Sequence, residues 1–153
     1  MNSFHFIKTT AILLLAALLL IHLTGCDGRP RRVPVTGTVL VDGKPLEGEI
    51  QGYVRFMPTA GGRSAQAALD KNGNFVLGNY EETDGCPLGE YKVEIQAFEV
   101  NGNRMRYLIP PRYGNPKTSG ITVKIDKKGQ AVQLKTEWTA KDSPWRKKSH
   151  VME

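Results

Sequence analysis

The alternation of apolar and polar residues with a period of two is the feature that most constrains the fold of this chain. It is clearest in residues 90–100, where every second residue from Tyr91 to Ala97 is apolar. Successive side chains of a β-strand point to opposite faces of a sheet, whereas an amphipathic helix repeats about every 3.6 residues. Residues 33–138 are therefore predicted to form strands, and they show no convincing helical period.

Seven segments carry this alternation, and turns join them. Asp42-Gly43-Lys44-Pro45 and Asp70-Lys71-Asn72-Gly73 have the composition of tight turns between strands. Many short strands without helices fold into sandwiches or barrels, and seven strands match an immunoglobulin-like size. We therefore predict an all-β, antiparallel Greek-key β-sandwich. The predicted strands are residues 33–41, 49–57, 65–69, 74–77, 90–100, 121–125 and 132–136.

The N-terminus has a different pattern, because an uncharged apolar run over residues 9–25 follows the basic residue Lys8. A positive start before a short apolar core is typical of a secretory signal peptide. The run is shorter than the about 20 apolar residues that a transmembrane helix needs. It ends in Leu23-Thr24-Gly25-Cys26, which resembles a bacterial lipobox. The resemblance implies that the Cys26 thiol receives a diacylglyceryl group and that a peptidase cleaves before it.

This interpretation divides the chain into four parts. Residues 1–25 are the signal peptide, predicted to be a helix, and residues 26–32 are a lipidated tether. Residues 33–138 form the sandwich, and residues 139–153 are a flexible basic tail. The protein is then an exported, membrane-anchored lipoprotein of the bacterial cell envelope. An ordinary secretory signal with an incidental Cys26, or an uncleaved anchor, would account for the same run.

Catalysis is not expected, because the usual catalytic side chains are missing. Cleavage before Cys26 would leave 128 residues with a single histidine, His150, and none lies within residues 33–138. Most nucleophilic and zinc-dependent mechanisms need a histidine as base or ligand. Cys86 would have no disulfide partner, and acidic neighbours such as Asp84 would raise the pKa of its thiol. We predict no enzyme activity and a structural role for Cys86.

No metal or cofactor is expected either. Asp70-Lys71-Asn72-Gly73-Asn74 places oxygen ligands at alternate positions, and Glu81 has the spacing of the last ligand of a calcium loop. However, Phe75-Val76-Leu77 between them has the pattern of a strand. A plain hairpin turn is therefore the favoured interpretation of this motif. The acidic residues Glu81, Glu82 and Asp84 could hold a cation between the sheets, which is the less favoured interpretation of this loop.

Residues 100–120 are the candidate contact surface. They form a predicted loop that is long for a compact domain, and such loops are often functional. Arginine and tyrosine are enriched at binding hot spots. The alternative is that Tyr107, Leu108, Ile109 and Tyr113 cover one edge of a sheet, with Pro110-Pro111 stiffening the crossing. Expected partners are the membrane and an envelope protein or glycan, and export disfavours nucleic acid. The candidate residues are Arg104, Arg106, Tyr107, Arg112 and Tyr113.

Four segments together resemble a known family. They are the lipobox and residues 35–48 (VTGTVLVDGKPLEG), 86–95 (CPLGEYKVEI) and 110–125 (PPRYGNPKTSGITVKI). They are similar to small lipoproteins of planctomycete-type bacteria that carry one transthyretin-like domain, also described as carboxypeptidase-regulatory-like. The resemblance implies a two-sheet sandwich on a lipid anchor, with a non-catalytic binding or structural role. It implies no reaction or ligand. A glycan- or polymer-binding surface module is the alternative function.

Overall fold

A computed structural model describes residue 28, residues 30–146 and residues 150–151 of the protein. The predicted signal peptide, the lipobox and Cys26 lie outside the described residues, and so do Lys147 and Lys148 of the basic cluster near the C-terminus. The fold is therefore described from residue 31 onward.

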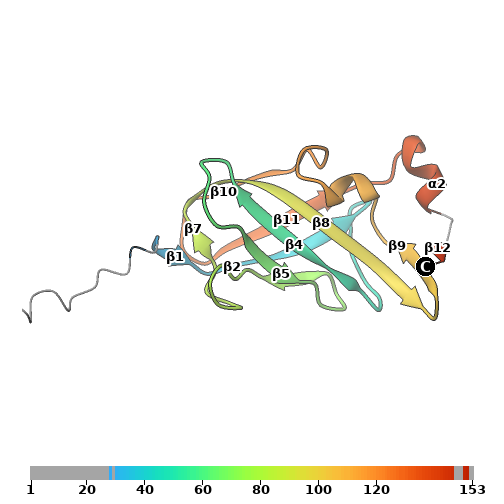
Figure 1. The fold of residues 1–153 in the computed structure, drawn as a ribbon, viewed down its shortest axis with the longest axis horizontal. Helices are drawn as coiled ribbons and strands as arrows, with labels where there is room; N and C mark the ends of the chain where they lie inside the picture. The colour runs from blue at the N-terminus through green and yellow to red at the C-terminus, as the bar shows by residue number, and fades with distance from the viewer. Residues whose placement is uncertain (1–27, 29, 147–149, 152–153) are drawn as a thin grey trace, which may run out of the picture. The chain divides into compact units, whose positions relative to one another are not determined.

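Two β-sheets pack face to face, which confirms the predicted all-β sandwich (Figure 1). Strand β8 is central in the larger sheet and pairs with β4 on one side and with β10 and β9 on the other. The strands of the larger sheet are β4 (Gln51–Pro58), β5 (Ala65–Ala68), β8 (Gly89–Asn101), β9 (Arg104–Tyr107), β10 (Thr122–Ile125) and β12 (His150–Val151). Those of the smaller sheet are β2 (Val35–Val41), β3 (Lys44–Pro45), β6 (Asn74–Val76) and β11 (Gln130–Thr136). Two short strands, β1 (Arg32–Val33) and β7 (Cys86–Pro87), pair with each other.

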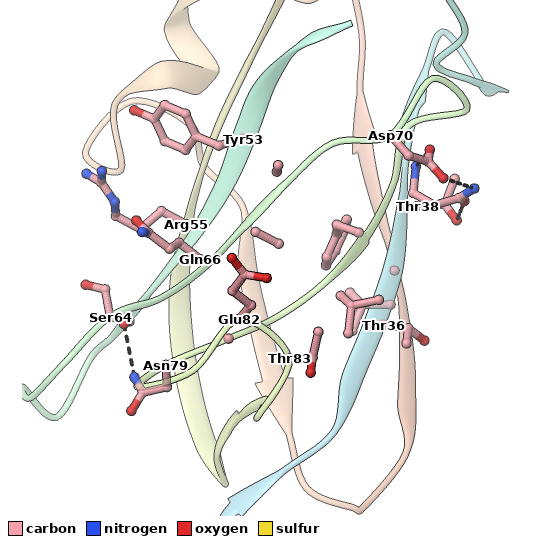
Figure 2. Close-up of a pocket in the computed structure, with 18 of the residues that line it drawn as sticks. Thr36, Thr38, Tyr53, Arg55, Ser64, Gln66, Asp70, Asn79, Glu82 and Thr83 are labelled. Carbon is pink, nitrogen blue, oxygen red and sulfur yellow. Dashed lines mark hydrogen bonds between the residues drawn. The ribbon is translucent and has the colours of Figure 1, made fainter.

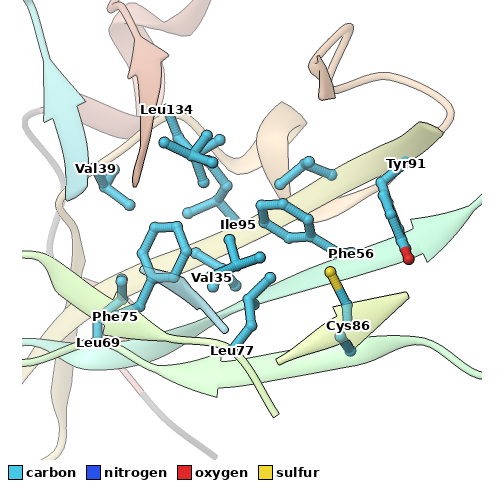
Figure 3. Close-up of a cluster of buried hydrophobic side chains, with 14 of the residues drawn as sticks. Val35, Val39, Phe56, Leu69, Phe75, Leu77, Cys86, Tyr91, Ile95 and Leu134 are labelled. Atoms are coloured by element: carbon cyan, nitrogen blue, oxygen red, sulfur yellow. The ribbon is translucent and has the colours of Figure 1, made fainter. Parts of the chain in front are cut away.

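The core lies between the sheets and is filled by the apolar residues of the alternating segments (Figure 3). The Phe56 ring is at its centre, with centroid distances of 6.0 Å to Phe75 and 5.9 Å to Tyr91. Tilted aromatic pairs at such separations contribute beyond simple burial of area. Cys86 is fully buried beside this cluster, as expected for a structural cysteine.

One strand pair runs parallel rather than antiparallel. β11 lies beside β2 in parallel, in a register that runs from Val35 opposite Gln130 to Val41 opposite Thr136. The other edge of β2 carries β3 and β6. The alternation of side chains is the same in both directions of a strand, so it could not predict this orientation.

Part of the predicted loop at residues 100–120 is a strand. β9 pairs with β8 from Phe98 opposite Tyr107 to Asn101 opposite Arg104. The two strands are joined by Gly102-Asn103, with Gly102 at a φ of +57°. A Gly-Asn pair between two alternating segments is a recognised hairpin signal, which the sequence analysis missed.

The C-terminal segment, predicted as a flexible tail, contains ordered turns. The 3-10 helix η2 (Ala140–Asp142) starts with a capping box between Thr139 and Asp142, and the short helix α2 (Ser143–Arg146) follows it. The Asp142 carboxylate also forms an ion pair with Arg112 of the 3-10 helix η1 (Pro111–Gly114). Desolvation acts to raise the pKa of Asp142, but hydrogen bonds from Arg112 and Thr139 hold it at about 2.

Replacing Gly37 with alanine should destabilise the fold. A Cβ at position 37 would lie 2.2 Å from Cζ of Phe75 and 2.6 Å from the Val132 carbonyl oxygen. We expect Gly37→Ala to lower the free energy of unfolding by about 1–3 kcal/mol, measured by urea denaturation. Gly28→Ala is the matched control, because none of the described residues has an atom within 4 Å of its Cβ position. Equal stability of the two variants would contradict the close approach of Phe75.

Acid stability should depend on Asp142. Its folded pKa of about 2 lies below the unfolded value of about 3.9. The carboxylate therefore stabilises the fold fully above about pH 4, and this contribution is lost as the pH falls towards 2. Asp142→Asn should be less stable than the parent at pH 7 and should lose less stability between pH 4 and pH 2. The control is Asp126→Asn in an exposed turn, and thermal unfolding across this pH range measures both.

Candidate functional site

The outer faces of five strands form a broad hollow, called the groove below (Figure 2). Its volume is about 1320 Å³, and β4, β5, β6, β2 and β11 line it. Because inward positions hold the large apolar side chains, outward positions on these strands are free to carry small or polar ones. The floor residues are Thr36, Gln66, Ala68, Val76, Ala131 and Gln133.

A hairpin between the two sheets makes the floor continuous. The backbone N–H of Gln66 donates to the Gly78 carbonyl at 2.8 Å, and the Gly78 N–H donates back to Gln66 at 3.0 Å. At the turn, the Asp70 N–H donates to the Asn74 carbonyl at 2.9 Å. β5 of the larger sheet and β6 of the smaller sheet are thereby tied together. The Asp70 carboxylate accepts two backbone N–H groups, as expected for the predicted plain hairpin turn.

The segment 78–85 forms one wall of the groove, and Asp84 holds it in shape. The carboxylate of Asp84 accepts the backbone N–H of Asn79 at 2.5 Å and that of Tyr80 at 3.2 Å. Desolvation opposes ionisation of Asp84, but these backbone hydrogen bonds and Arg32 lower its pKa. The Asn79 side chain is buried and donates to the carbonyls of Arg63 and Ser64. The wall is thus fixed to the body of the sandwich.

Two arginines support the same wall through Tyr80. The guanidinium carbons of Arg32 and Arg63 lie 4.9 Å and 4.7 Å from the centroid of the Tyr80 ring. Arg32 also forms an ion pair with Asp84 at 2.8 Å. Cation–π contacts of this length are attractive. Arg32 is the last residue of the predicted tether, residues 26–32, but in the structure it opens β1 and contacts the groove wall.

A polar cluster closes the end of the groove at β4. The Tyr53 hydroxyl donates to Glu94 at 2.5 Å, and Arg55 lies 3.4 Å from the same carboxylate. Glu94 is only 6% exposed. Burial, followed by the hydrogen bond to Glu94, raises the pKa of Tyr53. The Tyr53 hydroxyl is therefore fixed in place by Glu94 and stays protonated, so it is not suited to act as a general base.

The opposite end of the groove is closed by the hairpin turn. The Thr38 hydroxyl donates to Oδ1 of Asn74 at 2.7 Å, and Nδ2 of Asn74 donates to Asp70 at 3.2 Å. Figure 2 shows these groups at the far side of the floor from Asn79. Both ends and one wall are thus internally hydrogen-bonded, which makes the groove preformed.

The five residues of the predicted contact surface do not form one surface. Arg104 and Arg106 are exposed on β9 and line a smaller hollow of about 550 Å³, where Arg106 pairs with Glu99. The Tyr107 ring contacts Trp145 edge-on at 5.8 Å.

Arg112 and Tyr113 lie on η1 and have structural contacts. Arg112 binds Asp142, the Tyr113 hydroxyl at 3.0 Å and the Glu137 carbonyl at 2.7 Å. Tyr113 is 6% exposed, so it cannot be a contact residue. The burial of Tyr113 on η1, which packs against β8, agrees with the alternative in which this side chain covers the sheet.

The structure gives no geometric support for catalysis by Cys86 or for a metal site among the described residues. Burial, with a contribution from Asp84, raises the pKa of the Cys86 thiol, although a hydrogen bond with Tyr91 acts against it. The residues that the structure describes contain no group of three histidine, cysteine, aspartate or glutamate side chains placed to hold a metal.

None of the described helices has the length and apolar character needed to cross a bilayer.

Comparison with known proteins gives little similarity. No family model matches the sequence, and no curated protein matches it. Among solved structures, the crystal structure of the major pilin subunit of Bacillus cereus superimposes with a TM-score of 0.44 and 17% sequence identity. The superposition covers 71% of this chain and 30% of the pilin chain, so this chain spans less than a third of the pilin. Similarity of this size says nothing about function.

Loss of Asp84 should loosen the groove wall. Hydrogen bonds to a charged group contribute about 1.5–3 kcal/mol each. In Asp84→Ala, we therefore expect amide hydrogen exchange at Asn79 and Tyr80 to become about tenfold faster or more. Glu81→Ala is the control, because it removes an exposed carboxylate from the same wall. Unchanged exchange in Asp84→Ala would mean that other contacts hold the wall.

Proposed function

We propose that this protein is a lipid-anchored cell-envelope protein whose non-catalytic β-sandwich is a binding module. The observation that carries the proposal is the groove, which is open, preformed and built on strands rather than on mobile loops. Ligand sites are characteristically concave and largely preformed. The resemblance to transthyretin-like lipoproteins, proposed from the sequence, supports the same role.

The lipobox supports the anchor. Two or more acyl chains give stable membrane attachment, at about 0.8 kcal/mol for each buried methylene. The five residues 27–31 between Cys26 and the first strand span at most about 18 Å when fully extended. An acylated Cys26 would therefore keep the sandwich close to the bilayer, where the groove would meet other envelope components.

A binding role without catalysis agrees with the chemistry of the groove. The residues that line it include no histidine or cysteine. Glu94 is engaged by Tyr53 and Arg55, and Asp84 is engaged by backbone N–H groups and Arg32. A general base needs a lone pair that is available to the substrate. The groove instead offers amides, hydroxyls and small apolar side chains.

The anchor is tested by substitution of its cysteine. In the parent, mass spectrometry should show cleavage between Gly25 and Cys26 and an added diacylglyceryl group on Cys26. Cys26→Ala should abolish the lipid mass and shift the protein from the membrane fraction to the soluble fraction or to an uncleaved precursor. Cys86→Ala is the matched control and should keep both lipid and membrane location. A mature protein that still begins at Met1 would refute the anchor.

A further inference from the structure

We propose that the groove binds a neutral oligosaccharide segment of an envelope polymer. This rests on the proposed function, because it names the ligand class of the module described above. Three properties of the groove carry it: the balance of charge, the free hydrogen-bonding groups of the floor, and the small apolar side chains between them.

The charges of the groove disfavour an anionic polymer. The two arginines that line it are already engaged, Arg55 with Glu94 and Arg63 with Tyr80 and the Asn79 carbonyl. Carboxylates also line it, at Asp70 on the hairpin turn and at Glu81 and Glu82 on the wall. An anionic polymer would meet these carboxylates, while both cationic side chains among the described lining residues are already engaged.

The floor carries the groups that bind hydroxyls. Thr36, Gln66 and Gln133 are exposed, and within the described part of the chain their side chains have no intramolecular hydrogen-bond partner. Hydroxyl and amide side chains both donate and accept hydrogen bonds. Sugar hydroxyls also donate and accept hydrogen bonds, so each of these side chains can bind a sugar hydroxyl either as donor or as acceptor. In Figure 2, Glu82 lies near the middle of the labelled residues, and Gln66 lies beside its register partner Arg55.

Small apolar side chains lie between these polar groups. Ala68 and Ala131 are exposed on the floor, and Val76 is 44% exposed. A sugar ring has C–H groups on its faces as well as hydroxyls at its rim, and an alternating polar and apolar floor matches that distribution. The volume of about 1320 Å³ exceeds the about 300–1,000 Å³ of small-molecule pockets, which favours several linked rings over one.

A polypeptide partner fits the groove less well. Addition of a strand needs free main-chain groups at a sheet edge, but the N–H and carbonyl of Gln66 on β5 are bonded to Gly78. Protein interfaces concentrate Trp, Tyr and Arg at their centre and are depleted in Ala. Here the Tyr and Arg residues that line the groove lie at its end and on its wall, and the floor consists of Thr36, Gln66, Ala68, Val76, Ala131 and Gln133.

The proposal is tested by calorimetric titration of the full chain, purified in a detergent that has no sugar headgroup. The probes are cellohexaose, maltohexaose and chitohexaose, with hexagalacturonate as the anionic counterpart and an uncharged ten-residue peptide. At least one neutral hexasaccharide should bind, more tightly than its disaccharide and at least about tenfold more tightly than hexagalacturonate. No binding of any neutral hexasaccharide, or tighter binding of hexagalacturonate or the peptide, would overturn the proposal.

Variants locate the binding in the groove. Ala68→Trp should fill the floor and weaken binding of the hexasaccharide by about tenfold or more. Gln66→Ala and Gln133→Ala should each weaken it by about threefold to tenfold, through lost hydrogen bonds. The matched controls, Ala60→Trp and Gln51→Ala, change exposed residues outside the groove. If Ala68→Trp does not fold, the two glutamine variants decide. Parent-like binding in both would overturn the assignment.

The two proposals fail in different measurements. Lipidation and membrane location are measured in cells with Cys26→Ala, and sugar binding is measured on the purified chain. A lipidated, membrane-bound protein that binds no neutral hexasaccharide refutes the ligand class alone. A soluble, unlipidated protein that binds one refutes the anchor alone.

Discussion

The contact between Phe75 and Gly37 is the constraint on which the rest of the structure depends. Because residue 37 lacks a side chain, the Phe75 ring lies directly over β2 and reaches Phe56 in the core. This contact holds β6 against β2 and thereby brings the hairpin with β5 to the larger sheet. One buried ring thus closes the sandwich on this side, and the outward residues of the same strands become the floor of the groove.

Much of the fold could be predicted because burial leaves a periodic trace in the sequence. The alternation over residues 90–100 and the other six segments corresponds to real strands, and their apolar positions fill the core. The direction of β11 could not be predicted, because a period of two is identical in both directions. The C-terminal turns start at a capping box between Thr139 and Asp142, a local pattern that could have indicated them. The ion pair between Arg112 and Asp142, which lie 30 residues apart, could not be read from the sequence.

The groove was harder to predict than the fold. Its floor joins Thr36 to Ala131, which are far apart in the sequence and lie side by side only because β2 and β11 pair. Threonine, glutamine and alanine at outward strand positions have no distinctive pattern. The segment 100–120 was predicted to be a contact surface because it is rich in arginine and tyrosine. In the structure, however, Tyr113 is buried and Arg112 binds other parts of the chain. Composition indicates which side chains could bind, whereas tertiary packing decides which ones are available.

The parallel pairing of β2 and β11 has a mechanical consequence. β2 follows the predicted tether closely, and it is flanked along its length by β11 on one edge and by β3 and β6 on the other. Tension between a membrane anchor and a polymer held in the groove would act along β2, across the direction of its interstrand hydrogen bonds. The seven residue pairs from Val35–Gln130 to Val41–Thr136 would then be loaded in shear and would have to break together. Such a strand resists extraction far better than one that can be unzipped bond by bond.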